Sequence, residues 1–247
     1  MKYSLFIALS FLMSACGVGP QHTPPTIALT FDVYSTTYTV AYPIMKKYGL
    51  VGTFFNDPAY IDDRKLPDYA TSEQLHELKD NGWSIQGYTS VDMIKLINAE
   101  GPRAALAKLI DVKSGMHRLG FTIETIAPAS RNWDYRLREL SQSIYTNVRA
   151  NKAVGKWQSY PIPDALNVQH GATVSLNGSD TFDSLGAQLD SLEASGGMWA
   201  AVIHKVGDES DPQMSVPADV FEAFCARIAA DVAAGKLRAA TFEEALR

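Results

Sequence analysis

Thr26-Ile-Ala-Leu-Thr-Phe-Asp32 is the stretch that decides the fold. It is a short apolar run that ends in a carboxylate, and such runs form strands that are buried on both faces of a parallel sheet. Helical and strand-like patterns alternate after it. Strands are expected at 51–55, 83–87, 122–127, 145–148, 198–204 and 237–241. Helices are expected at 38–48, from the capping box at 71–74 to 81, from Pro102 to 120, and at 134–141, 182–192 and 215–235. About seven strand–helix units predict an α/β fold, a distorted (β/α) barrel with about seven parallel strands.

The composition agrees with a globular domain. The chain has 247 residues, of which 46% are hydrophobic and 20% charged, so a disordered protein is excluded. The formal net charge is −5 and no basic block is present, so no nucleic-acid partner is expected. With two cysteines, Cys16 and Cys225, a disulfide framework is excluded as well.

The N-terminus has the pattern of a secretory signal. Residues 1–15 carry one early lysine and then an apolar run, and Cys16 follows two small residues. This predicts a lipoprotein signal peptide over 1–15, a tether over 16–25 and a barrel domain over 26–247. Acylated Cys16 would anchor the protein to a membrane of the cell envelope, facing the periplasm or the exterior. The alternative is an ordinary signal peptide that is cut near Ala15.

Polar side chains follow several of the predicted strands. They are Asp32 at the end of the first strand, Tyr88 and Asp92 after the third, Pro128 and Arg131 after the fourth, and His204 after the apolar run Met198–Ile203. In a parallel barrel these strand ends meet at one face. We therefore expect Asp32 and His204 to face each other across a common cleft.

Several of these stretches resemble the polysaccharide deacetylases that have a NodB-homology domain. The resemblance is carried by Ile27-Ala-Leu-Thr-Phe-Asp32, Gly52-Thr-Phe-Phe55, the stretch at 73–85, Val202-Ile-His204 and the terminal 241–246. It implies a distorted (β/α) barrel and removal of acetyl groups from sugars, with a divalent metal, usually zinc, held by one Asp and two His. It also implies a base on Asp32 and an acid on His204.

The positions that correspond to the metal ligands hold other residues. The resemblance places the ligands on Val33, Tyr88 and Asp92, of which only Asp92 is a good ligand for a hard cation. The family's Arg-Pro-Pro-Tyr-type motif falls on 127–131, with Pro128 in place and Arg131 displaced. We expect a family-type metal site to be weak or absent, and His170 or Asp180 are candidate replacement ligands.

Several of these residues also have simpler explanations. Asp92 could cap a helix, and Tyr88 could be a packing residue with a hydrogen-bonded hydroxyl.

Pro128, Arg131 and Trp133 are candidate substrate contacts. A sugar-stacking platform could form from Trp133, Trp157 and Tyr160.

Three functions remain open at this stage. One is a hydrolase of carbon–nitrogen bonds in N-acetylated envelope glycans, with Asp32 as base and His204 as acid. The second is a non-catalytic glycan-binding or scaffolding lipoprotein on the same fold. The third is metal-free acid/base hydrolysis by Asp32 and Asp92 as a carboxylate pair.

Overall fold

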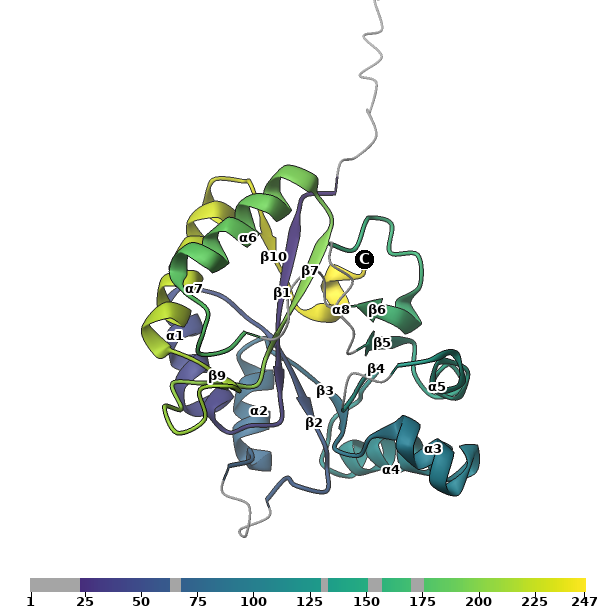
Figure 1. The fold of residues 1–247 in the computed structure, drawn as a ribbon. Helices are drawn as coiled ribbons and strands as arrows, with labels where there is room; N and C mark the ends of the chain where they lie inside the picture. The colour runs from purple at the N-terminus through teal and green to yellow at the C-terminus, as the bar shows by residue number, and fades with distance from the viewer. Residues whose placement is uncertain (1–22, 63–67, 130–132, 151–156, 170–175) are drawn as a thin grey trace, which may run out of the picture.

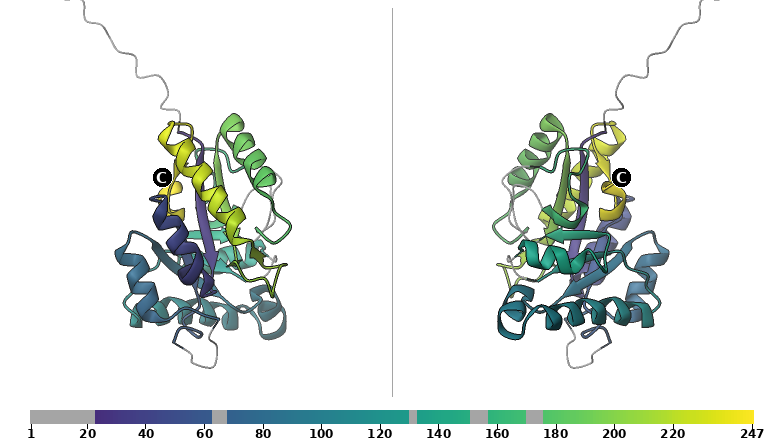
Figure 2. Two further views of the ribbon diagram at one scale, coloured as in Figure 1. Left: turned by 90° about the vertical axis from the view of Figure 1, so that its left-hand side faces the viewer. Right: turned by 90° about the vertical axis from the view of Figure 1, so that its right-hand side faces the viewer.

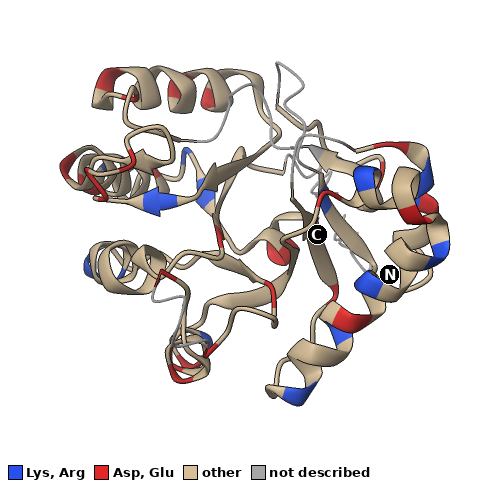
Figure 3. Cartoon of the chain, turned by 60° about the horizontal axis from the view of Figure 1, so that its bottom comes forward, with Lys and Arg blue, Asp and Glu red and all other residues tan. Residues whose placement is uncertain are grey.

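The computed structural model describes residues 23–62, 68–129, 133–150, 157–169 and 176–247 (Figure 1). Within these residues, a curled sheet forms the centre and helices cover its outer face, as the two side views show (Figure 2). The predicted distorted (β/α) barrel is confirmed. Positively and negatively charged residues both occur along the outer helices (Figure 3). No helix in the described part of the chain is long and apolar enough to cross a membrane.

The main sheet is parallel. Its strands are β1 (Thr26–Asp32), β2 (Thr53–Asn56), β3 (Ser84–Thr89), β4 (Thr125–Pro128), β5 (Asn147–Ala150), β6 (Val168–Gln169), β7 (Met198–Ile203) and β10 (Arg238–Ala239). The order is β10-β1-β2-β3-β4-β5-β6, and β7 pairs with β1 over residues 26–31. All of these ladders are parallel, so the carboxyl ends of the strands gather at one end of the barrel, the lower end of β1 in Figure 1.

The helices follow the predicted order. They are α1 (Tyr42–Lys47), which continues a π-helical turn at Thr37–Ala41, then α2 (Ser72–Asp80), α3 (Met93–Glu100), α4 (Pro102–Arg118), α5 (Tyr135–Ser141), α6 (Phe182–Ser195), α7 (Ala218–Ala233) and α8 (Phe242–Ala245). Short elements complete the chain: the 3₁₀ turn Ala165–Asn167 and the pair β8 (Lys205–Val206) and β9 (Ser215–Val216).

Two of the predicted helix starts have different outcomes. The capping box at α2 is confirmed, because the Thr71 hydroxyl accepts from the Gln74 amide at 3.2 Å and the Gln74 side chain accepts from the Thr71 amide at 3.0 Å. The predicted start at Ser215 is wrong. Ser215 lies in β9 and its hydroxyl accepts from the Asp208 amide at 2.8 Å, so α7 begins later, with Pro217 as its N-cap.

The described parts of 157–177 cover the free edge of β7. The backbones of Gln158 and Met198 exchange two hydrogen bonds, of 3.0 and 2.7 Å, at the start of β7. The Leu176 amide donates to the Val202 carbonyl at 2.9 Å near its end. The described parts of 157–177 thereby connect the β6 side of the sheet to β7 and complete the curl.

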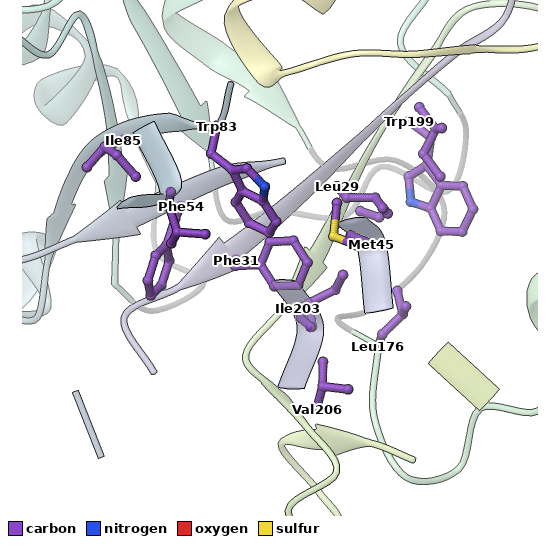
Figure 4. Close-up of a cluster of buried hydrophobic side chains, with 14 of the residues drawn as sticks. Leu29, Phe31, Met45, Phe54, Trp83, Ile85, Leu176, Trp199, Ile203 and Val206 are labelled. Carbon is purple, nitrogen blue, oxygen red and sulfur yellow. The ribbon is translucent and has the colours of Figure 1, made fainter. Parts of the chain in front are cut away.

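Alternate residues of β1 face two different cores. Leu29 and Phe31 point outward into the larger core between sheet and helices, where the rings of Phe31 and Trp83 lie 5.3 Å apart (Figure 4). Ala28 belongs to a second cluster inside the barrel. The two-residue period of a strand places Asp32 on the same inward face as Ala28. This period is why a carboxylate at the end of β1 enters the barrel rather than the helix layer.

Candidate functional site

Asp32 and His204 lie next to each other at the carboxyl ends of β1 and β7. The ladder pairs Phe31 with Ile203, so the residues that follow are neighbours, and His204 Nε2 is 3.8 Å from Asp32 Oδ2. The two side chains are thus brought together, and a cleft between them stays a prediction. The Asp32 side chain is fully buried and that of His204 is 16% exposed. Of the pair, the imidazole is therefore the group that reaches the surface.

Arg149 on β5 is the main partner of Asp32, and the sequence did not predict it. Its Nη1 lies 2.7 Å from Asp32 Oδ1, and its Nη2 donates to Oδ2 at 2.8 Å. Nη1 also donates to the Thr30 hydroxyl at 3.0 Å, and the guanidinium lies 4.6 Å from the centre of the Phe55 ring. Both charged side chains are fully buried. Because β2, β3 and β4 separate β1 from β5 in the sheet, this ion pair crosses the barrel interior.

The register of β4 and β5 relates Arg149 to the family motif. The last paired residues are Ile126 and Val148, so Ala127 and Arg149 are the next residues on adjacent strands. The resemblance puts the family's arginine at Ala127. The guanidinium is thus supplied from the neighbouring strand. Its position directly after the strand expected at 145–148 was the signal in the sequence that could have identified it.

Val33 and Tyr88 fill the space where the resemblance places two metal ligands. Val33 is 6% exposed, has a φ of 46°, and donates its amide to the Phe55 carbonyl at 2.9 Å. Tyr88 is buried in the same inner cluster. Burial, and secondly the negative charge of Asp32, raise the pKa of the Tyr88 phenol well above its ordinary value. The phenolate that could ligate a metal is therefore strongly disfavoured.

Asp92 acts as the N-cap of α3. Its carboxylate accepts from the amides of Ile94 and Lys95 at 3.1 and 3.0 Å, as the capping interpretation predicts. Among the described residues, no group of three or more His, Cys, Asp and Glu side chains is placed to hold a metal. Asp180 accepts from the Asn177 amide at 2.8 Å within a turn, and His170 lies outside the described residues. The residues present do not fit the family's zinc site.

The proposed substrate contacts have different positions. Pro128 ends β4 and is buried, and Trp133 is half-buried against the outer core. Arg131 lies outside the described residues. The stacking platform is wrong for Trp157 and Tyr160. Trp157 is buried 5.1 Å from the Trp199 ring, and the Tyr160 hydroxyl donates to α8 at 2.8 Å. The bridge between Gln158 and the start of β7 holds this segment at the amino ends of the strands.

Comparison with known proteins finds relatives of the first half of the chain. The polysaccharide deacetylase family model matches residues 19–137. Over this stretch, which is 119 of its 247 residues, the chain is similar to the polysaccharide deacetylases. The chain is 33% identical over 88 residues to "Putative polysaccharide deacetylase YxkH" of Bacillus subtilis (strain 168), a match that spans 35% of this chain and 30% of that protein.

Solved structures share the fold over most of the chain. A family 4 carbohydrate esterase from Streptomyces lividans, solved with acetate, has a TM-score of 0.55 at 14% identity and covers 87% of this chain and 91% of its own. The peptidoglycan deacetylase PdaC of Bacillus subtilis has a TM-score of 0.53 at 16% identity, with 90% of each chain covered. A mutant of BA3943, described as a CE4 family pseudoenzyme with restored activity, has a TM-score of 0.53 at 10% identity, with 91% and 68% covered.

Proposed function

We propose that the protein recognises an N-acetylated glycan at the Asp32–His204 end of the barrel and does not perform metal-assisted hydrolysis. The match of residues 19–137 to the polysaccharide deacetylase family model supports the coarser function, that of a hydrolase acting on N-acetylated glycans. The observation that carries the finer proposal is the buried Asp32–Arg149 pair. Both oxygens of the family's base are held by a guanidinium, and the positions of two ligands are filled by Val33 and Tyr88.

The magnitudes favour binding over catalysis. Zinc lowers the pKa of bound water from 15.7 to about 7, which is the main source of the nucleophile in such enzymes. Without the metal, a positioned general base contributes only about 10²–10⁴ in rate. The carboxylate of Asp32, held by Arg149 and fully buried, is poorly placed to take a proton from water. A pseudoenzyme with this fold has a precedent in BA3943.

Metal-free hydrolysis is the second candidate. Its support is the 3.8 Å approach of His204 Nε2 to Asp32 Oδ2 and the partial exposure of the imidazole. Water would attack the acetyl carbonyl while the neutral imidazole of His204 takes its proton, and the same imidazole would then give that proton to the leaving amine as the C–N bond breaks. Asp32 would orient the imidazole. The carboxylate pair of Asp32 and Asp92 has less support, because Asp92 caps α3.

One experiment separates these functions. The purified protein is given N-acetylglucosamine oligomers with zinc, cobalt or nickel, and acetate release, metal content and oligosaccharide binding are measured. We expect binding, no acetate release above background, and far less than one metal ion per chain. Acetate release that disappears in both Asp32→Asn and His204→Ala would overturn the proposal in favour of a hydrolase. Failure to bind or cleave any acetylated glycan would reject both.

We also propose that the protein is anchored in the cell envelope through acylated Cys16, which lies outside the described residues. The tether would then enter at the amino end of β1, while Asp32 lies at the carboxyl end. An anchored barrel would present Asp32 and His204 on the side away from the tether. A Cys16→Ala variant should move from the membrane fraction to the soluble fraction, and mass spectrometry of the mature N-terminus should find a diacylated or triacylated cysteine in the wild type.

A further inference from the structure

Three tyrosine rings stack beside the Asp32 site. The rings of Tyr34 and Tyr69 lie 5.8 Å apart at an interplanar angle of 27°, and those of Tyr69 and Tyr60 lie 4.7 Å apart at 29°. All three side chains are half-buried. We call Tyr34, Tyr69 and Tyr60 the tyrosine stack. It joins the loop after β1 to the loop after β2, two segments that no motif in the sequence connects.

The backbone holds the stack in place. An isolated antiparallel bridge pairs Tyr34 with Tyr69, and the Ser35 amide donates to the Asp68 carbonyl at 2.7 Å. The Tyr60 amide donates to the Asp57 carbonyl at 3.1 Å, and the buried Asp57 carboxylate accepts from the amides of Ala59 and Ser90. The rings are therefore fixed by folded loops and are preorganised for a ligand.

One end of the stack begins at the Asp32–His204 site. The Tyr34 amide donates to the Asp32 carbonyl at 2.6 Å, and Lys205, the residue after His204, places its ammonium 5.0 Å from the centre of the Tyr34 ring. Lys205 is itself paired with Asp208 at 2.8 Å and Asp211 at 3.3 Å. Its charge is compensated within the protein, so this end of the stack does not attract an anionic ligand.

Tyr60 is the other end. Within the described residues, its ring has one aromatic contact, to Tyr69, and no cation lies over it. Tyr69 is enclosed between two rings, and Tyr34 between a ring and an ammonium. Within the described residues, Tyr60 thus has the fewest ring and cation contacts of the three.

We propose that the tyrosine stack binds a neutral pyranose ring of the glycan, adjacent to the sugar residue that lies at His204, with Tyr60 as the outer contact. This inference rests on the proposed function and specifies a second position at which the protein binds the glycan. The C–H face of a pyranose ring packs on an aromatic ring, and the sugar hydroxyls form hydrogen bonds with phenolic oxygens. A tyrosine can therefore contact both the apolar face and the hydroxyls of a sugar. Because Lys205 is already paired with Asp208 and Asp211, it offers no uncompensated cation to the carboxylate of a uronic acid.

The test compares one variant at the end of the stack with a matched control. Tetra-N-acetylchitotetraose is titrated into wild type, Tyr60→Ala, Tyr60→Phe and Tyr135→Ala by calorimetry. Tyr60→Ala should weaken binding by about 3–10-fold, the effect of losing one aromatic contact. Tyr60→Phe keeps the ring and should stay within about 2-fold of wild type. Tyr135, on α5 and 71% exposed, is the control and should have no effect.

The possible failures are distinguishable. Wild type that binds, with Tyr60→Ala binding equally well, overturns the tyrosine stack as a sugar site and leaves the proposed function standing. Wild type that does not bind rejects the proposed function and this site with it. A second measurement needs no variant: nuclear Overhauser effects between tyrosine ring protons and sugar C–H protons should be seen in the wild-type complex. Their absence in a complex that forms overturns the inference even where Tyr60→Ala fails to fold.

Discussion

Replacing Arg149 with methionine should destabilise the protein by about 3–5 kcal/mol, the cost of breaking a buried ion pair by removing one partner. The structure supports the upper part of this range. Asp32 would lose contacts at 2.7 and 2.8 Å, and its side chain is fully buried, so water cannot replace the guanidinium. Methionine keeps much of the side-chain volume over Phe55, which limits the effect of a cavity.

The surface pair of Arg138 and Asp164 is a matched control for this measurement. Arg138 Nε and Nη2 donate to the Asp164 carboxylate at 2.8 and 3.2 Å, but the side chains of Arg138 and Asp164 are 37% and 32% exposed. Arg138→Met should cost about 0–1 kcal/mol. Urea unfolding followed by tryptophan fluorescence gives both values. The double variant Asp32→Asn with Arg149→Met should recover part of the loss. The reasoning is refuted if Arg149→Met costs no more than Arg138→Met.

Three further outcomes are expected. Burial raises the pKa of the Glu243 carboxyl above its ordinary value, so the folded protein binds this proton more tightly than the unfolded chain does. The free energy of unfolding should therefore fall as the pH rises from the ordinary pKa through the raised one. Glu243→Gln should reduce this pH dependence, measured by urea unfolding between pH 4 and 8. Val33 is a β-branched residue at a φ of 46°, a backbone conformation that costs about 1–2 kcal/mol for valine and that asparagine tolerates. Val33→Asn should therefore destabilise the protein by about 1–2 kcal/mol less than Val148→Asn, a change in the buried strand β5. Equal losses of stability in the two variants would contradict backbone strain at Val33. The combined change Val33→Asp, Tyr88→His and Asp92→His should bind zinc near one ion per chain by calorimetry, while wild type binds none; no uptake by this variant would show that the backbone no longer supports the family's metal site.

The fold was predictable because its signals are local. The apolar run of β1, the capping box of α2 and the proline at the start of α4 each specify an element without knowledge of the rest of the chain. Ser215 was misassigned because a serine before an apolar helical stripe matches a cap, yet a nearby amide takes its hydroxyl. That competition depends on the path of the loop at 207–214, which the sequence pattern does not encode.

The site was predictable only where topology decides contacts. Asp32 and His204 end two strands, and adjacency of those strands is enough to bring them together. Arg149 meets Asp32 across the barrel, at a distance in sequence that no short motif spans. The tyrosine stack depends on two loops folding against each other, and the aromatic residues expected at the mouth, Trp157 and Tyr160, are held at the opposite end by one backbone bridge.

Val33, Tyr88 and Ala127 differ from the residues that the family resemblance implies, and these differences depend on one another. A buried Asp32 needs a cation, and Arg149 supplies it from β5 next to the alanine that takes the place of the family's arginine. Val33 joins Tyr88 in the apolar inner cluster, which a second carboxylate at position 33 would disrupt. Restoring that aspartate alone would bury a negative charge beside Asp32, with the neutral phenol of Tyr88 unable to help hold a metal. Recovery of a metal site therefore requires the ligands to change together, and a single reversion should destabilise the barrel without binding zinc.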